Sequence, residues 1–161
     1  MEIVLRALSE VSGYDIFGTA VIIQIVYSSR KEPSVLFLPA VEDPQTNDEP
    51  KPDWRIEVAF SLAPNSAPRT TTAGTLDVLE PGSPNAKLSQ AAIASIKHLS
   101  ATGELEIPTV LRCVKTPNGR YVVGYGQLPV IMGGQAVYVQ GGHWMVYLSE
   151  DFAECSVVGG R

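Results

Sequence analysis

The sequence predicts a mainly β domain: an antiparallel β-sandwich or barrel of jelly-roll or Greek-key type, with one α-helix near residues 84–101 and a C-terminal β-meander. Three observations support this fold class. Apolar segments of strand length recur along the chain, separated by segments rich in Gly, Pro, Asn and Ser. One segment has the spacing of an amphipathic helix. Paired glycines and an Asn-Gly dipeptide mark tight turns in the last third of the chain.

Length and composition indicate one domain with a large core. The chain has 161 residues, of which 45% are hydrophobic and 18% charged. We therefore expect residues 1–161 to form a single β-rich domain that needs no cross-link for stability. The charged fraction is low for a protein that remains alone in water, which indicates surface buried against another molecule.

The charge pattern argues against nucleic-acid binding. The net charge is −5, and Arg30-Lys31 is the only pair of adjacent basic residues. A groove or tail that neutralises phosphates would need clustered basic residues, so we expect no direct nucleic-acid binding. The first residues, MEIVLRALSEV, lack the pattern of a signal peptide, and no apolar run reaches the roughly 18 residues that cross a bilayer. We therefore expect no membrane association, and a location in the cytoplasm or in an assembled particle.

Three strands are expected in the first half. Residues 19–27 form a nearly continuous β-branched run, and residues 34–41 would pair with them as a hairpin. Residues 54–62 alternate, with Trp54, Ile56, Val58, Phe60 and Leu62 on one face.

Polar segments separate these strands. Residues 42–53 contain five acids and three prolines without an apolar residue, so we expect a mobile surface loop. A second polar segment, residues 63–74, precedes a short candidate strand at residues 75–80. The conformation of both loops is left open.

The helix has recognisable ends and one apolar stripe. Ser83 is the expected N-cap, with Pro84 at the first helical position, and Gly103 is placed to end the helix. The stripe recurs at spacings of four and three residues and consists of Leu88, Ala92, Ile96 and Leu99.

Glycine-containing turns define the meander. If Asn118-Gly119 is a two-residue loop, Val114 pairs with Val123 and Arg112 with Tyr125. Gly133-Gly134 and Gly141-Gly142 are likewise expected to be two-residue loops, so that the segment between them pairs with a strand on either side.

The last of these turns predicts two faces. Val139 with Trp144 and Val137 with Val146 would form the core face. The opposite face would pair Gln140 with His143, Tyr138 with Met145 and Ala136 with Tyr147. Aromatic, thioether and polar groups of this kind are typical of protein interfaces. We therefore predict an interface formed by Tyr138, Gln140, His143, Met145 and Tyr147.

No cluster of residues predicts catalysis. Cys113 and Cys155 belong to no metal-binding spacing, and whether they pair is left open. His98 is expected near the end of the helix, and His143 has no carboxylate nearby in the sequence. We expect no cofactor, no metal and no catalytic residue.

These features lead to one main hypothesis and two alternatives. The main one is a non-catalytic structural or partner-binding protein whose interface packs on a second copy or on another protein. Low charge and long polar loops on a β framework resemble subunits of virus, phage or shell particles in architecture. One alternative is a small-ligand-binding or hydrolytic β-barrel protein that uses His143 with Tyr138 or Cys113. The other is an acidic inhibitor or immunity-type protein that docks through residues 42–53.

Overall fold

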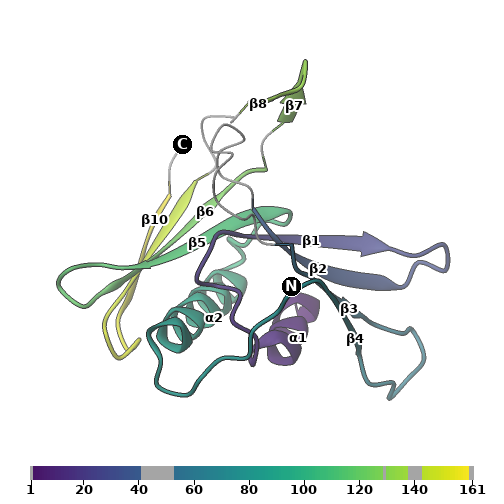
Figure 1. The fold of residues 1–161 in the computed structure, drawn as a ribbon, viewed down its shortest axis with the longest axis horizontal. Helices are drawn as coiled ribbons and strands as arrows, with labels where there is room; N and C mark the ends of the chain where they lie inside the picture. Colours follow the sequence, from purple (N-terminus) through teal and green to yellow (C-terminus); the bar gives the residue numbers. More distant parts are fainter. Residues whose placement is uncertain (1, 41–52, 129, 138–142, 160–161) are drawn as a thin grey trace.

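The computed structural model of the chain describes residues 2–40, 53–128, 130–137 and 143–159. Its main feature is an eight-stranded antiparallel sheet with the strand order β10-β9-β6-β5-β1-β2-β3-β4. Two helices and a separate two-stranded hairpin complete the described elements (Figure 1). In chain order the elements are α1 (Glu2–Val11), β1 (Val21–Tyr27), β2 (Pro33–Pro39), β3 (Arg55–Ala59), β4 (Arg69–Ala73), α2 (Pro84–Thr102), β5 (Thr109–Lys115), β6 (Tyr121–Gly126), β7 (Val130–Met132), β8 (Gln135–Val137), β9 (Trp144–Leu148) and β10 (Cys155–Gly159).

Both helices pack against one face of the sheet. Helix α1 contacts β2 and β3, whereas α2 contacts β5, β6 and β9 (Figure 1). The sheet is open, because β4 and β10 lie at opposite ends of the strand order. The expected mainly β, antiparallel fold is therefore confirmed in its sandwich-like form, with helices as the second layer. We call the sheet face toward the helices the inner face and the opposite one the outer face.

The fold consists of two halves with the same order of elements. Each half is a helix followed by four strands that pair as a meander: α1 with β1 to β4, and α2 with β5, β6, β9 and β10. The halves meet where β1 pairs with β5, through Val21 with Leu111, Ile22 with Val110 and Ile23 with Thr109. In the second half, the β7–β8 hairpin is inserted between β6 and β9.

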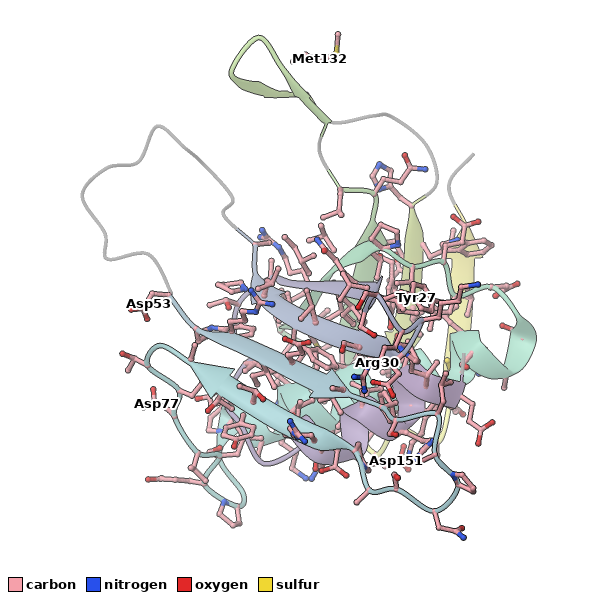
Figure 2. The ribbon with its side chains drawn as sticks, turned by 90° about the vertical axis from the view of Figure 1, so that its right-hand side faces the viewer. Tyr27, Arg30, Asp53, Asp77, Met132 and Asp151 are labelled. Atoms are coloured by element: carbon pink, nitrogen blue, oxygen red, sulfur yellow. The ribbon has the colours of Figure 1, made fainter. Side chains whose placement is uncertain are left out.

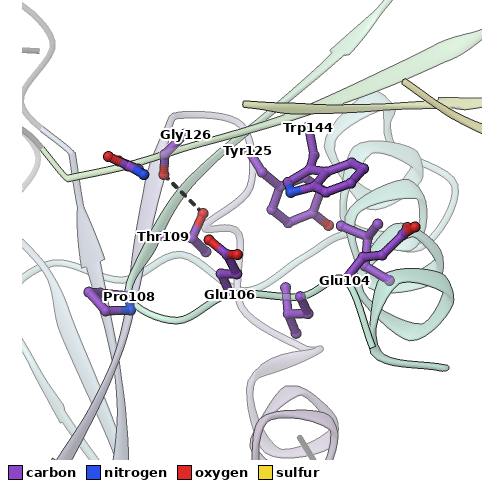
Figure 3. A pocket seen from close by; sticks show the side chains of 10 residues that line it. Glu104, Glu106, Pro108, Thr109, Tyr125, Gly126 and Trp144 are labelled. Carbon is purple, nitrogen blue, oxygen red and sulfur yellow. Dashed lines mark hydrogen bonds between the residues drawn. The ribbon is translucent and has the colours of Figure 1, made fainter. Parts of the chain in front are cut away.

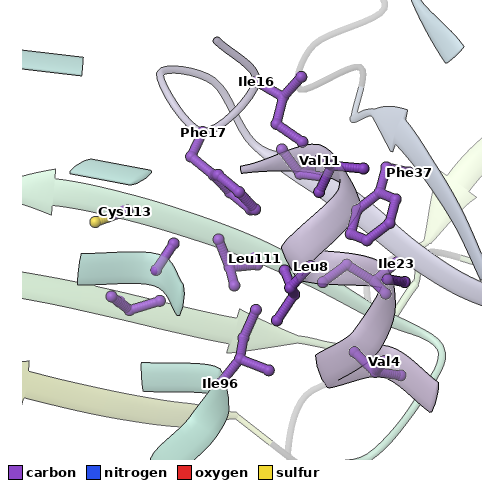
Figure 4. Packing of buried hydrophobic residues seen from close by; sticks show 14 of the residues in the cluster. Val4, Leu8, Val11, Ile16, Phe17, Ile23, Phe37, Ile96, Leu111 and Cys113 are labelled. Carbon is purple, nitrogen blue, oxygen red and sulfur yellow. The ribbon is translucent and has the colours of Figure 1, made fainter. Parts of the chain in front are cut away.

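The core lies between the helices and the inner face. Leu8 and Val11 of α1 meet Ile23 and Phe37 of the sheet, and Ile96 of α2 lies in the same cluster (Figure 4). All five side chains are buried. The inner face takes alternate residues of each strand, as the twofold period of a strand requires.

Helix α1 is an element that the sequence analysis did not predict. Its buried residues Val4, Ala7, Leu8 and Val11 recur at helical spacing, so the signal was present in the sequence. The Arg6 guanidinium lies 4.9 Å from the centre of the Phe60 ring and adds a cation–π contact between the helix and the end of β3.

Helix α2 and its expected caps are confirmed. The Ser83 side chain accepts a hydrogen bond from the Ala86 N–H, and Pro84 begins the helix. Gly103 ends it with a left-handed φ of 75°, which glycine adopts without steric cost. Within the predicted stripe, Ala92, Ile96 and Leu99 are buried, and Leu88 packs partly against the core.

The three strands expected in the first half of the chain are confirmed as β1, β2 and β3, but the structure after β3 differs from the prediction. Trp54, Ile56, Val58 and Phe60 are buried as expected, but Leu62 lies beyond the strand and is 68% exposed. The acidic segment lies outside the described residues except for Asp53, which is exposed.

The polar segment 63–74 contains a strand that the sequence analysis assigned to a loop. Residues 69–73 form β4, the edge strand beside β3. Threonine is β-branched and favours strands, and its polarity fits an exposed edge. Residues 75–80 were expected to form a strand but instead lie along the segment after α1, where the Asp15 N–H donates to the Asp77 carbonyl over 2.8 Å.

One hairpin register differs from expectation. Gly119 adopts a φ of +83°, and the Thr116 N–H donates to the Arg120 carbonyl over 2.8 Å. These features extend the loop by Pro117, giving a turn followed by a bulge at Gly119. Pairing therefore shifts by one residue. Cys113 faces Val123 and Arg112 faces Gly124, in place of the expected pairs Val114 with Val123 and Arg112 with Tyr125.

The Gly133-Gly134 turn is confirmed. The two glycines have φ values of 58° and 80°, and Met132 pairs with Gln135 directly beside them. Positive φ at both positions is the requirement of a type I′ turn. The hairpin extends away from the sheet, with Met132 at its tip (Figure 2).

The C-terminal meander is confirmed, but its predicted pairing before β9 is wrong. Both neighbours of β9 are other strands: Val146 pairs with Val123 of β6 and with Val157 of β10. The predicted pairs Val137 with Val146 and Ala136 with Tyr147 therefore do not form, since Val137 pairs with Val130 and Ala136 with Ile131. The other predicted pairs involve residues 138–140, outside the described part of the chain.

Replacement of Leu8 by Ala tests the packing of α1. Leu8 is buried, so we expect its truncation to lower the free energy of unfolding by about 2–5 kcal/mol through lost burial and a residual cavity. Urea unfolding followed by circular dichroism measures this change. The matched control is Glu10→Ala at an exposed position of the same helix, expected to change stability by less than about 0.5 kcal/mol. Equally small effects of both substitutions would contradict the packing.

Candidate interaction surface

The outer face of the meander carries exposed apolar side chains. Strands β5, β6, β9 and β10 present their alternate residues here, and no helix in the described part of the chain covers them. Val114 is 47% exposed, Met145 36%, Tyr147 42% and Val158 56%. Together with the less exposed Val122, these residues form what we call the outer meander face.

Strand register makes this surface continuous. Tyr147 of β9 lies opposite Val122 of β6, which in turn lies opposite Val114 of β5. Met145 lies opposite Val158 of β10. Side chains directly opposite one another on antiparallel strands are in contact range, so the five residues form one apolar patch across four strands.

Two glycines of β6 lie beneath side chains from the neighbouring segment. A Cβ at Gly124 would lie 3.3 Å from the Met145 sulfur, and a Cβ at Gly126 would lie 3.2 Å from His143 Nδ1. The thioether and the imidazole therefore occupy the space that a side chain on β6 would fill. His143 thus has a packing role over the Gly126 backbone, although its side chain is largely exposed.

The patch has a polar margin with a shallow groove. A groove of about 290 Å³ adjoins Tyr147 and is lined also by Arg120, Ser149, Glu154 and Ser156. The positive charge of Arg120, the negative charge of Glu154 and the hydroxyl groups of Ser149 and Ser156 therefore border the apolar residues. An apolar centre with tyrosine, methionine and a charged margin is the composition typical of protein interfaces.

The structure brings part of the predicted site together. Met145 and Tyr147 share the outer face as expected, and His143 lies next to them in the chain. Tyr138 and Gln140 lie outside the described residues. Val114 and Val122 were not predicted, since only the pairing of strands distant in sequence brings them near Tyr147. Val158 was not predicted because no strand was expected at residues 155–159.

A small cavity lies on the inner side of the sheet below Trp144. Glu104, Glu106, Thr109 and Tyr125 are among its lining residues (Figure 3). Its volume of about 20 Å³ is close to the minimum for one water molecule. The cavity is therefore too small for an organic substrate.

The polar groups around this cavity are engaged in structural hydrogen bonds. The Thr109 hydroxyl donates to the Gly126 carbonyl over 3.0 Å, and the Ser95 and Tyr125 hydroxyls lie 2.7 Å apart. Desolvation raises the pKa of Tyr125 far above its ordinary value. The hydrogen bond with Ser95 lowers this pKa, but by less than burial raises it. Tyr125 therefore remains a neutral phenol and does not act as a base near neutral pH.

The two cysteines are free thiols with different surroundings. Cys113 is buried on the inner face of β5, and Cys155 is partly exposed on β10. Strands β6 and β9 lie between them. With neighbouring strands roughly 4.8 Å apart, three steps are too far for a disulfide. Burial raises the pKa of Cys113 to about 12, so it is not a thiolate nucleophile near neutral pH.

The described residues form neither a metal-binding cluster nor a membrane-spanning helix. These residues contain no group of three or more His, Cys, Asp or Glu side chains that could hold a metal ion. None of the helices among them is long and apolar enough to cross a membrane.

Thiol labelling tests the environment of the cysteines. At pH 8 we expect a disulfide reagent to react far more rapidly with the partly exposed Cys155 than with Cys113, which should react only after denaturation, because the reagent needs an accessible thiolate. Desolvation also raises the pKa of Cys155, so we expect it to react more slowly than a free thiol. Absorbance of the released reagent counts the thiols. The Cys155→Ser variant should show no rapid reaction, and rapid reaction of two thiols in the native protein would contradict the burial of Cys113.

The raised pKa of Cys113 also predicts a pH dependence of stability. Above its ordinary pKa of 9.0 the unfolded thiol loses its proton, whereas the folded thiol keeps it up to about pH 12. The free energy of unfolding should therefore fall as pH rises from 9 toward 12. Urea unfolding at several pH values measures the slope. The Cys113→Val substitution should make this slope smaller. A slope of the same sign should remain, because the pKa of Tyr125 is also raised. An unchanged slope in the variant would contradict the assignment to Cys113.

Comparison with protein-family models, with curated protein sequences and with solved structures finds no match for this chain.

Proposed function

We propose that this chain is a non-catalytic structural subunit that associates with copies of itself through the outer meander face. The observation that carries the proposal is the continuous apolar patch around Met145 and Tyr147 on an uncovered sheet face. An antiparallel sheet with water on one face ordinarily shows polar side chains there. The patch on this meander departs from that pattern, and apolar patches on a sheet mark interaction sites.

Composition and charge support self-association. The patch itself contains no acidic residue, so two copies can meet there despite the net charge of −5. Tyr147 beside a groove fits the description of an interface hot spot, in which an aromatic residue fills a pocket on the partner. A subunit of a shell or particle, as the sequence suggested, is the finer form of this proposal.

The catalytic alternative has less support in the described residues. His143 packs over Gly126. Cys113, its proposed partner, is buried and protonated. The cavity on the inner side accommodates about one water molecule. No observation favours the acidic inhibitor either, since residues 42–52 lie outside the described part of the chain.

The solution mass tests the proposal directly. We expect multi-angle light scattering across a concentration series to show an oligomer that persists at high salt, because apolar contacts are not screened. Tyr147→Ser should weaken association at least tenfold, since central aromatic residues contribute about 2 kcal/mol or more to interfaces. Its melting temperature should change little, because the side chain faces outward.

Tyr27→Ser is the matched control. Tyr27 is 69% exposed at the end of β1, outside the outer meander face. Its replacement should leave the oligomer unchanged. A monomer at every concentration, or equal effects of the Tyr147 and Tyr27 variants, would overturn the proposal.

A further inference from the structure

One edge of the sheet has the properties of a strand that pairs with another strand. β10 pairs with β9 on one side and has no partner strand on the other among the described residues. It consists of Cys155, Ser156, Val157, Val158 and Gly159 and contains no charge and no proline. Proteins commonly block exposed edges with lysine, proline or bulges, and β10 has none of these.

The hairpin register shows which backbone groups point away from β9. The Ser149 N–H donates to the Glu154 carbonyl over 3.0 Å, at the start of the β9–β10 ladder. Because bonded and non-bonded pairs alternate in an antiparallel ladder, Ser156 and Val158 also bond to β9. The N–H and carbonyl groups of Cys155, Val157 and Gly159 therefore face the open edge.

We propose that β10 pairs antiparallel with β10 of a second copy, about a twofold axis at Val157. In this register Val157 lies opposite Val157 of the other copy, and Cys155 lies opposite Gly159. All edge-facing groups of both strands then pair, since an antiparallel strand presents complementary donors and acceptors to its own copy. The result is one continuous sheet of twice the width.

The side chains of β10 suit this self-pairing. The register opposes no like charges, because the strand is uncharged. Ser156 lies opposite Val158, and Cys155 lies opposite Gly159 of the other copy. A Cβ on Gly159 would lie 2.6 Å from the Trp144 ring, so Cys155 of one copy would face the indole that covers Gly159 of the other.

The second copy is a better occupant than an unrelated strand for a geometric reason. The twofold axis stands perpendicular to the sheet, so both outer meander faces end on the same side. Val158 and Met145 of the two copies would then form one larger apolar strip across the joint. The opposite edge, β4, gains no such burial, because Arg69 and threonines occupy most of that strand.

This inference rests on the proposed self-association but uses the sheet edge, so separate substitutions test the two. Val157→Pro removes an N–H that faces the open edge and leaves the bonds to β9 intact. We expect it to lower the affinity of the edge dimer at least tenfold in analytical ultracentrifugation, with the β9–β10 hairpin retained. If Val157→Pro leaves the mass unchanged while Tyr147→Ser reduces it, the edge pairing is wrong and the proposed function stands. The reverse result would support the edge and overturn the face.

A cross-linking experiment tests the register even if the proline variant does not fold. In a Cys155→Ser background, Val157→Cys places the new thiol opposite its own copy, with Cα atoms roughly 5.5 Å apart, within disulfide range. The matched control is the wild-type chain, because its Cys155 lies on the same face of β10 as Val157 but opposite Gly159 rather than itself. We expect a disulfide dimer on mild oxidation for position 157 and at least fivefold less for position 155. Equal yields, or no dimer at position 157, would overturn the proposal.

Discussion

The pairing of β1 with β5 is the constraint on which the rest of the fold depends. Three residue pairs, centred on Ile22 and Val110, join two four-stranded meanders into one sheet. Val21, Ile23, Thr109 and Leu111 on the inner face of this joint are all buried. Since α1 covers strands of one half and α2 those of the other, the joint aligns both helices over a common core. The seam has only three residue pairs, and the contact of α1 with α2 joins the two halves a second time on the inner side.

Local patterns in the sequence predicted local structure, but they did not predict which strands pair when these lie far apart in the chain. The caps of α2 and the turn at Gly133-Gly134 depend on a few adjacent residues, and both were predicted. The shift after Asn118 arose because Pro117 joins the turn, a difference of one residue that changes every pair. Strand β4 was missed since polar threonines at an exposed edge resemble a loop.

The candidate surface was likewise predicted only where it depends on local sequence. Alternation within residues 144–148 correctly placed Met145 and Tyr147 on the outer face. Their neighbours on β6 could not be predicted, because the β7–β8 hairpin separates β6 from β9 in the sequence. The role of Gly124 and Gly126 depends on the segment beside them, whose Met145 and His143 side chains cover the bare backbone.

The two proposed contacts, through the outer meander face and through the β10 edge, do not compete. Edge pairing extends the sheet within its own plane, whereas contact through the face stacks one sheet on another. Because the proposed edge axis would turn both outer faces to the same side, a pair formed at β10 would present a doubled apolar strip to a second pair. Two such pairs stacked face to face would close with twofold symmetry at every contact, and closed symmetry limits growth. Contact through the face without the edge axis would instead end at a dimer, so under the two proposals the edge contact would determine whether assembly stops at two copies.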